Sequence, residues 1–104
     1  ARVRAHLRGE VLADSDRSLR VRETGHAPVT YFPRADVRFE HLERTDHETF
    51  CPFKGAASSW TARAGGRTEE NLAWSYEEPF DEVAGLAGYV AFYPERMEWE
   101  REEP

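Results

Sequence analysis

The spacing of the apolar residues constrains the fold of this chain more than any other feature. They recur at every second position in short runs, as Val3, Ala5 and Leu7 do between polar neighbours. No window keeps apolar side chains at i, i+3, i+4 and i+7 through three turns, which a core-facing helix needs. Period-two alternation instead places one side of a strand against a core. The chain is therefore predicted to be mainly β.

Turn residues between the apolar runs predict antiparallel hairpins. Gly9 follows the first run, and Gly65-Gly66 separates two runs of strand-forming residues. Glycine accepts the positive φ that tight hairpin turns need. The strands expected after the first hairpin are Leu19–Glu23, Val29–Phe32, Val37–Leu42, Glu48–Cys51, Ser58–Arg63, Asn71–Tyr76, Gly88–Tyr93 and Met97–Glu100.

One of these runs, Gly88–Tyr93, is continuously apolar, which is typical of a central strand buried on both faces. Helix is expected only as one or two short turns, at Arg34–Asp36 and Phe80–Leu86, and Arg101–Pro104 is expected to be a frayed tail. Short strands without a long amphipathic helix predict a compact antiparallel barrel or sandwich.

Length and charge narrow the classes of protein. A chain of 104 residues fits a single domain, here taken as residues 1–104. Fourteen Lys and Arg against twenty Asp and Glu give a net charge of -6, which disfavours binding to nucleic acid or to anionic membranes. The most apolar stretch, Val83–Tyr93, is too short to cross a bilayer, and no signal-peptide pattern stands at the N-terminus. We expect a cytoplasmic monomer or homodimer.

Neither a metal nor another cofactor is expected. The single cysteine, Cys51, excludes an intrachain disulfide and zinc sites built from Cys-x-x-Cys pairs. His47 lies four residues before Cys51, and in an extended chain that spacing separates them by about 13 Å, too far for one ion. His26 and His41 are the other candidate ligands considered.

The densest group of chemically useful residues is Cys51-Pro52-Phe53-Lys54-Gly55. An ammonium three residues from the thiol would favour the thiolate, so Cys51 is a candidate nucleophile. The structural interpretation, which the sequence favours, is a small buried hydrophobe at a strand end. Lys54 is the only lysine in the chain, and we expect it to be an exposed ligand for an anion, helped by backbone N–H groups of the turn.

Two further groups could contribute to a site. Glu23 and His26 lie three apart in a loop before Tyr31, and a carboxylate and an imidazole so placed could act as acid and base or merely stabilise the loop. Trp74 and Tyr76 share one face of a strand by the period-two rule, with the residue between them on the other. Such aromatic side chains form either a core or the wall of a small-molecule pocket.

Five motifs in this order together resemble the bacterial and fungal DUF427 family, over about residues 3–99. They are Gly9-Glu10-Val11-Leu12-Ala13-Asp14-Ser15, Tyr31-Phe32-Pro33, Cys51-Pro52-Phe53-Lys54-Gly55, Trp74-Ser75-Tyr76 and Val90-Ala91-Phe92-Tyr93.

The resemblance implies a β-tent architecture like that of zinc-binding methionine sulfoxide reductases. Zinc in that architecture sits on two Cys-x-x-Cys pairs, which Cys51 alone does not supply. The family is sometimes labelled a nucleotidyltransferase-type domain. Nucleotidyl transfer needs carboxylates that hold Mg²⁺ beside a triphosphate, and no close acidic pair here is joined to a glycine-rich phosphate loop.

The sequence favours a domain that binds a small anionic molecule in a pocket. The expected ligand-binding residues are Tyr31, Cys51, Lys54, Trp74 and Tyr76. One alternative is a small enzyme with Cys51 as nucleophile or redox centre and His26 or Glu23 as base. A second is an oligomer or protein-interaction module without a ligand.

Overall fold

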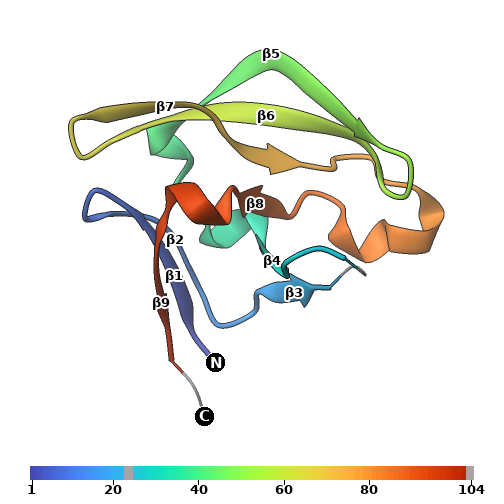
Figure 1. Cartoon of the computed structure of the whole chain (residues 1–104), viewed down its shortest axis with the longest axis horizontal. Coiled ribbons are helices and arrows are strands. Elements are labelled where there is room, and N and C mark those ends of the chain that lie inside the picture. Colours follow the sequence, from blue (N-terminus) through green and yellow to red (C-terminus); the bar gives the residue numbers. More distant parts are fainter. Residues whose placement is uncertain (23–24, 103–104) are drawn as a thin grey trace.

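The computed structural model describes residues 1–22 and 25–102, in which nine strands form two antiparallel sheets (Figure 1). The predicted mainly β fold is confirmed. Neither sheet closes on itself, because the strand orders are the open series β2-β1-β9 and β3-β4-β8-β7-β6-β5. A closed barrel is therefore not the architecture of this chain.

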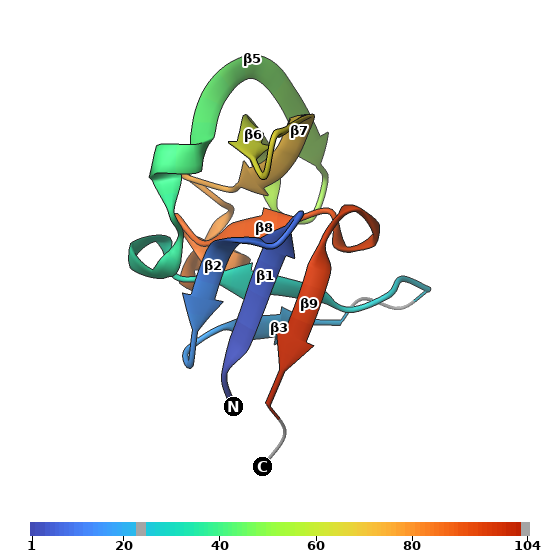
Figure 2. The ribbon, with the colours of Figure 1, turned by 90° about the vertical axis from the view of Figure 1, so that its left-hand side faces the viewer.

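The three-stranded sheet joins the two ends of the described chain. Strands β1 (Val3–Leu7) and β2 (Glu10–Ser15) form the hairpin predicted at Gly9. Strand β9 (Glu98–Arg101) pairs antiparallel with the other edge of β1. In Figure 2 these three strands run steeply across the strands of the larger sheet.

In the six-stranded sheet, β8 (Val90–Phe92) lies between β4 (Val29–Phe32) and β7 (Arg67–Ser75). Val90 and Phe92 are both 0% exposed, so the prediction of a central strand buried on both faces is confirmed. The short strand β3 (Leu19–Val21) pairs with β4 at one edge.

The other half of the large sheet is a pair of long hairpins. Strand β6 (Gly55–Ala64) pairs with β5 (Leu42–Cys51) and with β7, the latter through the predicted glycine turn. Strand β5 begins at Leu42 rather than Glu48, and it arches away from β6 where the pairing register shifts between Arg44 and Glu48 (Figure 1).

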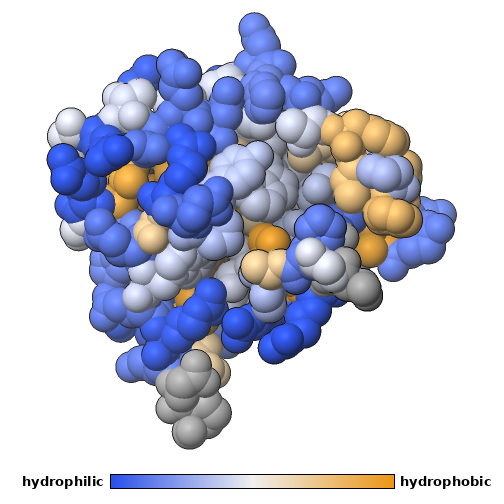
Figure 3. All heavy atoms as spheres, in the orientation of Figure 1, coloured by the Kyte–Doolittle hydropathy of each residue, from blue (hydrophilic) through white to orange (hydrophobic). Residues whose placement is uncertain are grey.

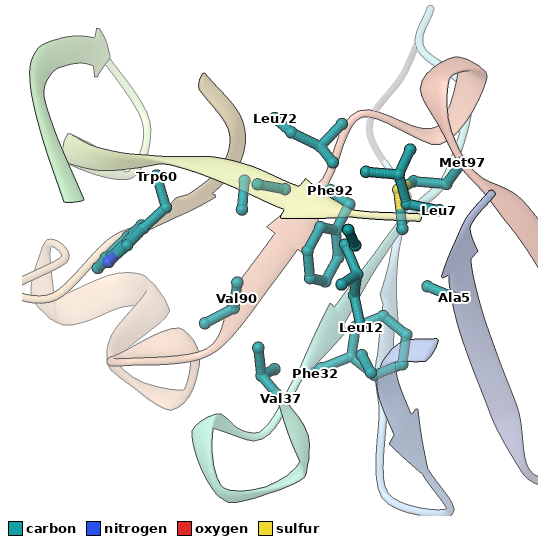
Figure 4. Close-up of a cluster of buried hydrophobic side chains, with 14 of the residues drawn as sticks. Ala5, Leu7, Leu12, Phe32, Val37, Trp60, Leu72, Val90, Phe92 and Met97 are labelled. Atoms are coloured by element: carbon teal, nitrogen blue, oxygen red, sulfur yellow. The ribbon is translucent and has the colours of Figure 1, made fainter. Parts of the chain in front are cut away.

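The main core fills the space between the two sheets (Figure 4). Phe32 and Phe92 enter it from the large sheet, where their rings meet edge to face at 6.0 Å. Leu12 enters it from the small sheet and is fully buried. Burial of this kind supplies most of the favourable free energy of folding for a small domain.

One predicted strand is wrong. Residues Val37–Leu42 alternate like a strand, yet Phe39–His41 is a 3-10 turn, η2. The backbone N–H of Arg38 donates to the carbonyl of Leu12 at 2.8 Å, which ties this segment to β2. Phe39 then packs edge to face on Trp60 of β6 at 5.9 Å. Tertiary contacts override the local alternation here.

The 3-10 turns η1 (Arg34–Asp36) and η3 (Asp81–Leu86) lie where helical turns were expected. A further turn, η4 (Pro94–Arg96), was not predicted. The expected frayed tail is wrong at its first residue, because Arg101 ends β9 and pairs with Val3. Within the described residues, no helix has the length and apolarity that crossing a membrane requires.

Candidate ligand-binding cleft

A cleft of about 900 Å³ opens between the β5–β6 turn, the outer face of β4 and β7, and the end of β9. Every described residue that the sequence pointed to as a candidate site residue lines it: His26, Tyr31, Cys51, Lys54, Trp74 and Tyr76. Glu23, the remaining candidate, lies outside the described residues. The sequence thus grouped side chains that the fold brings to one cavity, and their role in ligand binding stays a prediction.

An aromatic wall forms one side of the cleft. Tyr31 of β4 meets Trp74 of β7 edge to face, with ring centroids 6.3 Å apart. Tyr31 also lies 6.5 Å from Tyr76, at a tilt of 38°. Trp74 and Tyr76 follow the predicted period-two rule, so both reach the cleft while Ser75 between them is buried on the other side.

The opposite side of the cleft is the tight turn that joins β5 to β6. The backbone N–H of Lys54 donates to the Cys51 carbonyl at 3.2 Å and closes the turn. Gly55 follows with a φ of 116°, a conformation that favours glycine. The Lys54 carbonyl accepts from the Phe80 N–H at 2.9 Å, which fastens the turn to the chain beyond β7.

Lys54 differs from the prediction in one respect. Its side chain is 5% exposed, so the expected exposed lysine is wrong. The side chain is therefore turned away from water, and its backbone N–H is engaged within the turn instead of facing an anion. A charge in a buried position is costly unless partners surround it, so replacement of Lys54 should alter the stability of the fold.

Cys51 is half-buried at the end of β5 and lines the cleft beside Lys54. The candidate base on the described chain is His26, an exposed side chain on the same cleft, but no hydrogen bond joins it to Cys51 in the described part of the structure. Among the described candidates, nucleophile and base are therefore not joined by a hydrogen bond.

Sequence reasoning missed the contribution of β9. Trp99 lines the cleft, and its indole N–H donates to the Pro94 carbonyl at 2.9 Å while its ring stacks on Phe32 at 6.1 Å. Arg101 lies over the Trp99 ring at 5.0 Å and donates to Thr30 Oγ1 at 3.0 Å. The alternation of Met97 and Trp99 was the only signal in the sequence, and it indicated a strand rather than a site.

The turn η4 forms a third part of the wall through Pro94 and Glu95. Arg96 ties it to β7, because its Nη2 donates to Glu69 Oε1 at 2.8 Å. Hydrogen bonds from Arg96 and Arg67 hold the pKa of the Glu69 carboxyl below its usual range. This wall of the cleft thus depends on a carboxylate that must stay ionised.

Among the described residues that line the cleft, positive charges outnumber negative ones. Its described lining has two permanent cations, Lys54 and Arg101, against one carboxylate, Glu95. Over residues 1–22 and 25–102, no group of three or more His, Cys, Asp or Glu side chains is placed to hold a metal ion. What the cleft offers is an aromatic surface with two cations, in a chain whose net charge is negative.

A family model described as a domain of unknown function, DUF427, matches residues 1–103. The match spans the cleft, both sheets and all five motifs that carry the resemblance. No curated protein matches the chain.

Proposed function

The chain belongs to the DUF427 family, and we propose that it is a binding domain for a small anionic molecule with a flat apolar part. The ligand would occupy the cleft between the β5–β6 turn and the aromatic wall. Lys54 and Arg101 would balance its charge, while Tyr31, Trp74 and Tyr76 would cover its apolar part.

One observation carries this proposal. Two cations and several aromatic side chains from different strands converge on one cavity, although the chain as a whole is acidic. Local positive charge in a negative surrounding raises the concentration of anions at that place.

The size of the cleft supports a small molecule. Ligand pockets commonly have volumes of about 300 to 1,000 Å³ and are lined by apolar and aromatic side chains with few polar groups. The cleft, at about 900 Å³, lies within that range. Contact with the aromatic wall, above all with the half-buried ring of Trp74, would favour a planar group over a branched one.

Matched pairs of compounds test the proposal. Aromatic and aliphatic carboxylates and phosphates are titrated by calorimetry beside their neutral amides and methyl esters. We expect at least one anion to bind about tenfold or more tightly than its neutral partner, since a charge-assisted hydrogen bond is lost in the neutral compound. Equal binding of both partners, or binding of neither throughout the set, would refute the proposal.

Variants then locate the binding. Arg101→Gln and Lys54→Met should each weaken binding of the anionic compound and leave binding of the matched neutral compound nearly unchanged. Arg38→Gln is the matched control, because Arg38 is an exposed arginine away from the cleft. Melting temperatures of the free variants are recorded separately, since Lys54 is buried.

A small enzyme that uses Cys51 is the second candidate, favoured by the position of this thiol beside Lys54 on the cleft. The rate at which the Cys51 thiol is alkylated, measured as a function of pH, distinguishes the two functions. A thiol pKa well below about 8.5, with fast alkylation at neutral pH, would favour the enzyme. A slow thiol with an ordinary pKa would favour the binding domain.

A further inference from the structure

Three phenylalanine side chains are exposed at the end of the molecule where β5 turns into β6. Phe50 is 67% exposed, Phe53 74% and Phe80 40%. We call these residues the aromatic tip. Figure 3 shows a hydrophobic patch over this end of the molecule, bordered by hydrophilic residues. Exposed aromatic side chains gathered in one place mark an interaction surface more often than a random surface does.

The tip is held in one arrangement by the backbone beneath it. The Phe80 N–H donates to the Lys54 carbonyl, so the segment after β7 is fastened to the β5–β6 turn. The rings of Phe50 and Phe80 meet edge to face at 6.1 Å. Aromatic rings presented by a fixed backbone lose little conformational entropy when a partner covers them.

The two chain segments that contain the tip are acidic, although Arg34 and Arg44 lie beside them at Glu77. Residues 45–57 and 77–93, which contain the tip, hold six carboxylates and a single cation, Lys54. The excess of five carboxylates here compares with a net charge of -6 for the whole chain.

Most of these carboxylates are available to a partner. Glu77 is the exception, because Arg44 approaches it to 2.9 Å, and the hydrogen bond from Arg44 holds its pKa below the usual range. The others that flank the tip are exposed and form no ion pair within the described chain: Glu48, Glu78, Asp81 and Glu82. Three of these four lie within two residues of Phe80 in the sequence.

We propose that the aromatic tip docks a segment of a partner protein in which large apolar side chains are flanked by lysine or arginine. The charge decides between the possible occupants. A second copy of this chain would bring like charges together, and an anionic membrane would repel the same carboxylates. A basic partner would be attracted by the carboxylates that flank the tip, which we call the rim, and it would bury apolar surface against the phenylalanine rings. Phe53 lines the cleft as well, but Phe50 and Phe80 do not, so a variant at Phe50 tests this proposal apart from a cleft ligand.

A displayed library of random peptides of about 12 residues is the test, selected in parallel on the parent and on three variants. Phe50→Ser removes one ring of the tip. The double variant Glu78→Lys and Asp81→Lys reverses the charge of two carboxylates that flank it. Leu19→Ser is the matched control, because Leu19 is an apolar side chain, 40% exposed, on β3, which is the opposite edge strand of the large sheet from β5. The side chains replaced are exposed, so each variant should fold, and a melting curve verifies this.

The parent and Leu19→Ser should enrich peptides with large apolar residues next to lysine or arginine. A synthetic peptide of the enriched sequence should bind Phe50→Ser about tenfold more weakly, and its affinity for the parent should fall with added salt. No enrichment, enrichment of acidic or uncharged peptides, or equal binding to Phe50→Ser would each overturn the proposal. So would dimerisation or binding to vesicles of anionic or zwitterionic lipid that Phe50→Ser abolishes.

Discussion

The two faces of the central strands are built from different side chains. On β4, Phe32 enters the main core and Tyr31 enters a second cluster beside the cleft. On β8, Phe92 belongs to the core and Ala91 to the second cluster. The core face is aliphatic and phenylalanine-rich, whereas the cleft face carries tyrosine and tryptophan, whose polar atoms tolerate an opening to water.

The difference shows how one set of strands can serve stability and binding at once. Successive side chains of a strand point to opposite faces, so neighbours in sequence meet different environments. A substitution on the core face should therefore change the free energy of unfolding, and one on the cleft face should change binding more than folding. Four substitutions can break or sharpen this comparison.

The largest effect is expected for Phe92→Ala. Phe92 is 0% exposed and contacts Phe32 across the core, so the substitution leaves a cavity that the packed sheets cannot fill. We expect a loss of about 3 to 5 kcal/mol in the free energy of unfolding, measured by urea denaturation. Phe92→Leu, which keeps most of the volume, should lose much less. A Phe92→Ala protein that melts within a few degrees of the parent would contradict the central position of β8.

A smaller effect on stability is expected for Trp74→Leu on the cleft face. Trp74 is half-buried, and its ring packs against Tyr31 and against Tyr93 at 4.7 Å. We expect a loss of about 1 to 2 kcal/mol, because part of the ring already faces water. Any ligand of the cleft should nevertheless bind far more weakly. If Trp74→Leu were as destabilising as Phe92→Ala, the two faces would not differ in the way described.

The third substitution is expected to raise the free energy of unfolding rather than lower it. Ser75 of β7 is 0% exposed, and its hydroxyl has no hydrogen-bond partner within the described structure. Ser75→Ala removes a polar group that gains nothing from burial, so we expect a gain of about 0.5 to 1 kcal/mol in unfolding free energy.

Ser15→Ala provides the matched control for this change. Ser15 is almost as buried, but its hydroxyl donates to Asp36 at 2.6 Å and accepts the Arg17 N–H at 2.9 Å. Its removal should cost about 1 kcal/mol. Losses of similar size in both variants would show that the Ser75 hydroxyl has a partner after all.

The sequence predicted those parts of the fold that local rules determine. Gly9 and the Gly65-Gly66 pair place two hairpins because tight turns need positive φ, and the apolar run around Val90 places the central strand. It failed at Phe39–His41, where a hydrogen bond to β2 and packing on Trp60 overrule the alternation. Contacts between residues distant in sequence leave no periodic signal.

The same division applies to the cleft. The motifs predicted Tyr31, Cys51, Lys54, Trp74 and Tyr76 as one group, and all five line the cleft, although their binding role stays a prediction. Trp99 and Arg101 were missed because they come from the other sheet and reach the cleft only through the pairing of β9 with β1. The burial of Lys54 was missed because exposure depends on how the turn folds against Phe80.

The smallest expected effect concerns the wall of the cleft at low pH. Glu69 accepts hydrogen bonds from Arg96 and Arg67, which hold its pKa below the ordinary value of 4.5. A depressed pKa stabilises the folded protein above the unfolded pKa, and this contribution is lost as the pH falls through the folded pKa. Glu69→Gln should therefore be less stable than the parent at pH 7, by less than about 1 kcal/mol.

The difference between the parent and Glu69→Gln should shrink as the pH falls below the ordinary carboxyl value of 4.5 and through the lowered pKa of Glu69, since the parent carboxylate becomes protonated there. Urea unfolding at a series of pH values measures it. Glu70→Gln is the matched control, because Glu70 is adjacent and exposed, and only its backbone carbonyl accepts from Arg96. A constant difference at all pH values would mean that Glu69 holds η4 by packing rather than by its charge. The cleft wall would then resemble the core face instead of contrasting with it.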